Sequence, residues 1–331
     1  MPAGLGGGGK VGIAFETTMG TYVAPTIFVP ILSESLMYNE DKYYSEQIRQ
    51  QTVVSDVKQS FYHVEGDIEM EVDPTNLPYW MYASRHTIAK SAGPPYTYTY
   101  TPSSAGSAST AAGTTTPKTL SITIVRNSVV FGYTGCVVGS FEFVLGMDDG
   151  VLRCTMSVLG LAEAVQSAPS PSWSAPDLLG AAAHQVYLAA SAATPTFGAA
   201  DTGFNGFTFR ANYNAEAQNR INTLRSASYI SYGITEAEIE SELDFLTRTD
   251  YDNMVANTTR AVKLESANGG ATFAAGSSGV KLQGNRVSYD TYEVGLEGMG
   301  DLIMAGFTGR CVGITSGNPY QIEVKSTANI T

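Results

Sequence analysis

Two stretches of the chain alternate strictly between acidic and mostly apolar residues. The first runs from Asp67 to Asp73 with an acid at every odd position, and the second from Glu236 to Asp244 with an acid at every even position. Because side chains on a β-strand alternate between its faces, each stretch predicts a strand with one acidic face. Like charges along a strand face are destabilising, so we expect something outside the monomer to use these faces.

The second stretch also fits a helix. Residues 235–246 place Thr235 and Glu238 as a capping box and their larger apolar residues on one helical face. The first stretch has no such alternative, because it follows Gly66 and runs into Pro74. Since the two stretches resemble each other, we expect both to be strands.

The remaining pattern predicts further strands and two short helices. A helix is expected from Leu77, with Pro78 in its first turn and an apolar face that extends to Ile88. A second is expected at Thr249–Ala256. Alternation and β-propensity predict strands at 96–100, 120–124, 137–145 and 151–160, the last two joined by an Asp-Gly turn.

The order of these elements indicates an internal duplication. An acidic strand, a short helix and a final hairpin occur in the same order in both halves. We therefore expect two tandem β domains, at residues 1–166 and 177–331, separated by a Pro/Ser linker at 167–176. Residues 1–10 are predicted to be a flexible arm and 103–117 a low-complexity loop.

Composition agrees with a β-rich protein and excludes one class of function. Of 331 residues, 43% are hydrophobic and only 15% charged, with 34 Gly and 19 Tyr, which favours strands and turns over long surface helices. The net charge of −12 opposes any grip on nucleic-acid phosphates. No apolar run has the ~18 residues of a membrane span, and the glycine-rich start lacks a signal peptide, so we expect a cytoplasmic protein without a membrane partner.

The sequence offers little catalytic chemistry. The three cysteines are expected to be core thiols in a reducing compartment, and none of the three histidines has a metal-type partner at helical spacing. No nucleophile elbow, phosphate loop or dinucleotide fingerprint occurs. Glu69 with Glu71, or Asp148 with Asp149, has the residue types of a glycosidase pair or calcium site, but no cleft is predicted beside them. We expect no enzyme, no cofactor and no metal.

Several motifs in the first half resemble the major tail tube proteins of long, non-contractile-tailed (siphovirus-type) bacteriophages. In chain order they are Gly12–Thr21 with Ala24-Pro25, Leu32–Leu36, Gly66–Val72, Tyr98–Tyr100 and Tyr133–Val138. They span residues 12–160, and the second half shares them only through the internal repeat.

The resemblance implies two tail-tube-type β-sandwich domains whose strands join an intersubunit β-barrel around a lumen for genome DNA. With two domains per chain, three chains would make a pseudo-hexameric ring; six chains are the alternative. It also implies stacked rings, a place in the virion tail after assembly in the host cytoplasm, and a tape-measure protein, a tail terminator or distal tail proteins as partners. We expect residues 1–30 to serve stacking and to be dispensable for folding.

The acids of the two alternating stretches are the candidates for the lumen lining, because an acidic wall repels DNA. The candidate residues are Asp67, Glu69, Glu71, Asp73, Glu236, Glu238, Glu240, Glu242 and Asp244. The alternative is that they lie on an outer or inter-ring surface and aid solubility. Other functions left open are a pilus, surface-layer or capsid-decorating subunit, and a carbohydrate-binding β-sandwich.

Overall fold

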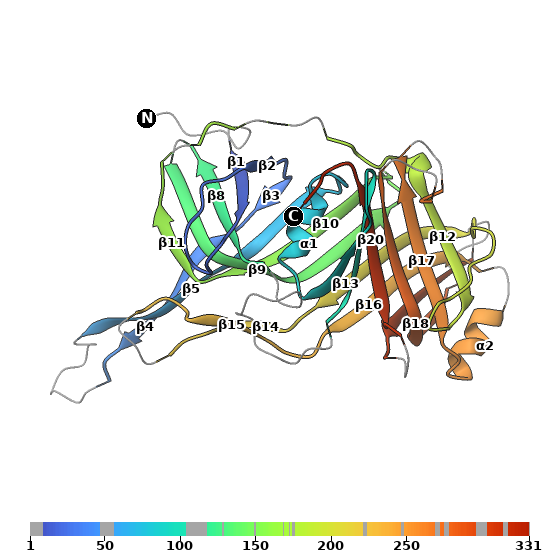
Figure 1. Cartoon of the computed structure of the whole chain (residues 1–331). Coiled ribbons are helices and arrows are strands. Elements are labelled where there is room, and N and C mark those ends of the chain that lie inside the picture. The colour runs from blue at the N-terminus through green and yellow to red at the C-terminus, as the bar shows by residue number, and fades with distance from the viewer. Residues whose placement is uncertain are drawn as a thin grey trace.

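Antiparallel strands make up most of the described chain, together with two short α-helices (Figure 1). The computed structural model describes residues 9–46, 56–103, 118–127, 129–148, 150–167, 169–171, 173, 176–220, 224–245, 248–268, 272–274, 278–295, 303–313 and 317–330. The expected arm, apart from its last two residues, nearly all of the 103–117 loop and part of the linker lie outside these residues. The predicted strands are confirmed, and residues 236–244 form a strand and not a helix.

One sheet, here called the wall sheet, runs without a break through both halves of the chain. Its strands pair in the order β3/β4, β5, β10, β9, β13, β16, β19, β18. Their bounds are β3 Ser33–Glu34, β4 Met37–Tyr44, β5 Val57–Glu71, β9 Val129–Gly146, β10 Leu152–Gly160, β13 Phe204–Asn212, β16 Glu236–Asp244, β18 Gly279–Val294 and β19 Met304–Cys311.

A second layer covers the wall sheet in each half. In the first half it contains β2 (Ile27–Val29), β1 (Lys10–Phe15), β8 (Leu120–Arg126), the beginning of β9, and β11 (Ala162–Val165). In the second half it contains β12 (His184–Ala190) after a 3-10 turn (Ala181–Ala183), β17 (Arg260–Ala267), the beginning of β18, β20 (Tyr320–Ser326), β7 (Tyr96–Pro102) and β6 (His86–Lys90). The long strands β9 and β18 therefore belong to both layers of their halves.

The wall strands of the two halves follow the same plan. In each, the acidic strand is the second of four wall strands and the long strand is the fourth. Each long strand also carries a β-bulge at the same place, with Gly139 as the extra residue in β9 and Asp290 in β18. A second bulge lies where β8 pairs with β9, and its counterpart where β17 pairs with β18. Bulges are specific features of a strand, so their coincidence makes the halves comparable residue by residue.

Helix α1 (Leu77–Tyr82) begins as predicted, with Pro78 in its first turn and Leu77, Trp80 and Met81 buried. The predicted extension of its apolar face is wrong: the helix ends at Tyr82, and Ile88 lies on strand β6. Helix α2 (Thr249–Val255) follows the second acidic strand but has no buried residue.

The core extends across both halves. One cluster of buried apolar side chains includes residues of the wall sheet, of α1 and of both covering layers. It also includes Val11 and Ile13 of β1, each 1% exposed. Deleting residues 1–30 would remove this buried strand, which argues against the expectation that this segment is dispensable for folding.

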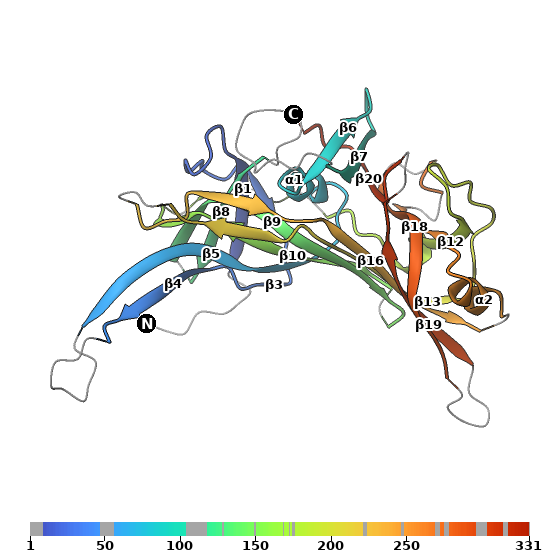
Figure 2. The ribbon, with the colours of Figure 1, turned by 90° about the horizontal axis from the view of Figure 1, so that it is seen from below.

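Each half extends a β-hairpin arm from its acidic strand. The first arm is formed by β4 and the beginning of β5, and the second by β14 (Ala215–Gln218) and β15 (Tyr229–Tyr232). The two arms lie side by side (Figure 1), joined by a bridge between Tyr62 and Ser226. The wall sheet is arched, and α1, β6 and β7 lie over its convex side (Figure 2).

Candidate functional site

Most of the acids selected from sequence lie on one face of the wall sheet. The buried side chains of its strands, such as Ile68, Phe143 and Ile239, belong to the core that contains α1. The alternating acids therefore point to the opposite face, on the concave side of the arch in Figure 2. We call this surface the acidic face.

On β5 the acids of this face are held by neighbouring hydroxyl groups. Ser157 Oγ donates to Asp67 Oδ1 at 2.5 Å, and Ser33 Oγ donates to Glu69 Oε2 at 3.0 Å. Glu71 follows on the same face and is partly exposed. Three of the four acids selected in this stretch thus share one exposed row.

Asp73 does not belong to that row. It is 4% exposed and lies after the end of β5. Its carboxylate accepts hydrogen bonds from the backbone N–H of Thr75 and from Asn76 Nδ2, both at 2.8 Å. Asp73 therefore stabilises the turn that precedes α1. It does not continue the row on β5 because the strand has ended before Pro74.

On β16 the acids remain on the acidic face along the whole strand. Glu236, Glu240 and Glu242 are exposed, whereas Glu238 and Asp244 are partly buried. Asp244 accepts a hydrogen bond from Asn205 Nδ2 at 2.9 Å. All five acids selected from this stretch therefore share the acidic face.

The pairing registers bring further charged residues onto this face that sequence reasoning missed. One row across the sheet reads Glu69, Thr155, Glu142, Arg210, Glu238, Arg310. Arg210 bonds Glu142 at 2.7 Å and Glu240 at 3.0 Å. The alternating residues Phe141-Glu142-Phe143 could have predicted that Glu142 lies on this face. A single arginine on β13 has no sequence pattern that would predict its position. The face is thus acidic, with arginines spaced among the carboxylates.

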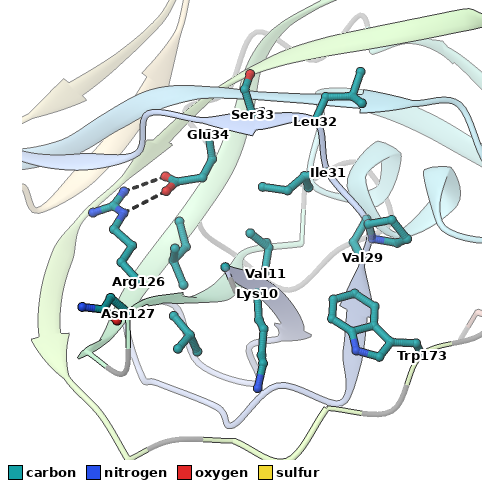
Figure 3. Close-up of a pocket in the computed structure, with 14 residues that line it drawn as sticks. Lys10, Val11, Val29, Ile31, Leu32, Ser33, Glu34, Arg126, Asn127 and Trp173 are labelled. Atoms are coloured by element: carbon teal, nitrogen blue, oxygen red, sulfur yellow. Dashed lines mark hydrogen bonds and ion pairs between the residues drawn. The ribbon is translucent and has the colours of Figure 1, made fainter. Parts of the chain in front are cut away.

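A sizeable hollow lies elsewhere. It has a volume of about 710 Å³ and is lined by residues of β1, β3 and β8, with Trp173 at one side (Figure 3). Arg126 crosses it to Glu34 with two hydrogen bonds, of 2.8 and 2.6 Å, which raise the pKa of Arg126. Glu34 and Arg126 are thus paired with each other, and Lys10 is a further charged residue of the lining.

A buried histidine marks the place where the halves meet. His86 is 2% exposed, with Ser84 Oγ 2.6 Å from its Nδ1 and the hydroxyls of Tyr213 and Tyr320 at 3.1 and 3.3 Å from its Nε2. Burial lowers the pKa of His86 to about 3. This neutral imidazole is enclosed by side chains of both halves, and solvent does not reach it.

The described residues contain no group of three His, Cys, Asp or Glu placed to hold a metal ion. The three cysteines are free thiols, and burial raises the pKa of Cys154 and of Cys311, the latter to about 12. No described α-helix has the length and apolarity needed to span a bilayer.

The wall sheet ends in two strand edges. The outer edge of β4 at residues 37–39 and that of β18 at residues 291–294 have no ladder partner within the described chain. Such edges are templates for pairing with another chain. The described sheet thus has one charged face and two edges open to pairing, features that suit a structural protein.

The family comparison agrees. The chain belongs to the phage tail tube protein family, whose profile matches residues 6–311. It is therefore a structural, non-enzymatic protein of the virion tail that polymerises with itself. Among curated proteins, no sequence matches it significantly.

Proposed function

We propose that three copies of the chain close into a ring whose wall sheets form one continuous barrel, and that rings stack into the tube of a long, non-contractile tail. The observation that carries this proposal is the pairing of β9 with β13 between two halves whose wall strands follow the same order. Each chain then supplies two of six equivalent positions. A ring of six chains is the alternative.

The proposal treats the halves as tandem tail-tube domains, residues 1–166 and 177–331, joined through the 167–176 linker. The matching bulges at Gly139 and Asp290 support a duplication. With four wall strands from each of six domains, ~24 strands at ~4.8 Å spacing and ~40° tilt give a circumference of ~150 Å and a backbone diameter of ~45–50 Å. Such a barrel encloses a channel.

The acidic face is proposed to line that channel. It lies on the concave side of the arch, away from α1 (Figure 2), and carries eight of the nine acids selected from sequence. Carboxylates repel DNA phosphates, so the genome passes such a wall without binding to it. Asp73 has its own structural role and is not part of this lining.

The partners follow from the same assembly. Contacts between the top of one ring and the bottom of the next are heterologous and extend as an open filament. A tape-measure protein, and a tail terminator or distal tail protein at an end, are proposed to complete the tail.

Electron microscopy of the purified protein tests the ring, and a gold label tests the lining. Tubes assembled from Glu240→Cys labelled with a maleimide–gold cluster are expected to show density inside the channel. The matched control is Ala89→Cys on β6, an exposed position over the convex side of the arch, whose density is expected outside. Gold at residue 240 on the tube exterior would refute the lining, and sheets or shells in place of tubes would refute the ring.

A further inference from the structure

The joint between the halves shows how one repeat pairs with the next. Strand β9 meets β13 with Phe143 opposite Phe209, Glu142 opposite Arg210 and Ser140 opposite Asn212. Phe143 and Phe209 are both fully buried. This internal joint is a complete antiparallel ladder.

The outer edge of β18 is the counterpart of the β9 edge used in that joint. Counted from the bulge residues Gly139 and Asp290, Glu142 corresponds to Glu293. In the same way Phe141 corresponds to Tyr292 and Ser140 to Thr291. Within the described chain, residues 291–294 pair only with β19.

The outer edge of β4 is the counterpart of the β13 edge. Arg210 lies opposite Glu238 on the acidic strand of its half, as Met37 lies opposite Glu65. Glu238 and Glu65 correspond, because they pair with the corresponding residues Arg310 and Leu159. Counting on from this pair, Ala211 corresponds to Tyr38 and Asn212 to Asn39.

We propose that β18 of one copy pairs antiparallel with β4 of the next, with Glu293 opposite Met37, Tyr292 opposite Tyr38 and Thr291 opposite Asn39. The proposal deepens the ring proposed above and rests on it. The apolar side chains at these edges are uncovered in the single chain: Met37 is 56% exposed, Tyr38 36% and Val294 40%. Pairing of two such edges completes both ladders at once.

The two arms support the same correspondence. Ala217 pairs with Ile230 in the second arm, and Tyr44 pairs with Val57 at the matching place in the first. The second arm packs on the first half, where Ile230 is buried in a small cluster with Val137 and Leu161.

Within the described residues, the Tyr44–Val57 end of the first arm has no such cover. Tyr44 is 54% exposed and Val57 48%. In the proposed joint this arm extends over the next copy, at the counterpart of the surface around Val137. That counterpart is Ser288, which pairs with Arg310 as Val137 pairs with Leu159. The same neighbour thus covers both the edge and the arm.

Disulfide cross-linking tests the register. Opposite positions of an antiparallel pair lie within disulfide range, whereas diagonal positions lie about 7–8 Å apart. The in-register variants are Met37→Cys/Glu293→Cys and Asn39→Cys/Thr291→Cys. The crossed variants, Met37→Cys/Thr291→Cys and Asn39→Cys/Glu293→Cys, contain the same four positions and respond only to a register shifted by two residues.

Under oxidation the in-register variants are expected to shift from one chain to a closed three-chain species in non-reducing gels, while the crossed variants stay single. Ser140→Cys/Asn212→Cys provides the internal calibration, because the same geometry exists there inside one chain. Single-cysteine variants measure the background from the native thiols.

Each outcome separates the register from the ring. The register would be overturned, and the ring kept, if the protein forms tubes in the microscope but the crossed variants cross-link. The same conclusion would follow if only the internal pair cross-links. A ladder that continues to six chains would keep the register and replace the three-chain ring. A protein that forms no rings or tubes, and no cross-links between chains, would overturn both.

Discussion

The internal joint between β9 and β13 and the two outer edges of the wall sheet have the same strand geometry but different side chains. At the internal joint, Phe209 is buried and Arg210 bonds Glu142 across the strands. At the outer edge of β4, Phe209 corresponds to Leu36, which is buried in the core, and Arg210 corresponds to Met37, which is exposed. A joint that forms during folding can contain large apolar groups. An edge that must remain soluble before assembly exposes fewer of them, since long apolar edges aggregate.

The largest expected effect is at the internal joint. Phe209→Ala removes a ring stacked 6.1 Å from Phe141 and should lower the free energy of unfolding by ~3–5 kcal/mol. Val294→Ala, at the outer edge, is the control and should cost the isolated chain ~0.5 kcal/mol or less. Urea unfolding of both variants measures the difference, and equal losses would show that the internal joint is no more consolidated than the outer edge.

The second effect concerns pH and the histidine beside the internal joint. The folded-state pKa of His86, about 3, lies below its ordinary value of 6.5, so on acidification the unfolded chain takes up a proton that the folded chain does not. The stabilising contribution is therefore complete above pH 6.5 and is lost as the pH falls towards 3, with a slope approaching ~1.4 kcal/mol per pH unit.

His86→Gln removes this titration while keeping a hydrogen-bonding side chain. The variant is expected to lose less stability than the wild type between pH 6.5 and 4, measured by urea unfolding at each pH. Parallel curves for the two proteins would contradict a neutral, enclosed imidazole. His63→Gln, at a partly exposed histidine on β5, is the matched control for the change of side chain.

A smaller effect would make the outer joint resemble the internal one. Met37→Arg places a cation opposite Glu293 in the proposed register and should lower the protein concentration needed for tube formation, by an interaction of ~0.2–1 kcal/mol per joint. Met37→Glu should raise that concentration, and Glu293→Lys in the same chain should restore it. Light scattering during assembly measures all three, and identical concentrations for the Arg and Glu variants would count against the register.

The smallest effect is the loss of the ion pairs at the internal joint. Arg210→Gln leaves Glu142 and Glu240 without their shared cation, but because these groups are about half exposed the cost should be only ~0.5 kcal/mol. High salt should reduce it further. Arg248→Gln, which breaks an exposed pair with Asp252 on α2, is the control outside the joint. A loss several-fold larger for Arg210 would mean that the acidic face depends on this arginine for stability.

Local features of this fold could be predicted from sequence. Strict alternation predicted the end of β5, and its recurrence favoured a strand over a helix for β16. The Asp-Gly turn predicted the β9–β10 hairpin, and Pro78 marked the start of α1. These signals act over a few residues, and the structure agrees with them closely. They also placed the acids of β16 on one face.

The long-range features could not be predicted in this way. The pairing of Phe143 with Phe209 joins residues far apart in sequence, so no local pattern sets its register. Asp73 continues the acidic pattern in sequence, but Pro74 ends the strand and the side chain caps a turn. Arg210 has no local signal at all, because its role depends on the strands on either side of it.

Strand β9 begins in the covering layer and ends in the wall sheet as one continuous backbone, and β18 does the same in the second half. A force that pulls the two layers apart therefore acts against covalent bonds as well as against side-chain packing. In the proposed tube, no such covalent strand connects one ring to the next. A tube built from this chain should therefore break between whole rings. Each fragment should keep both layers of its wall.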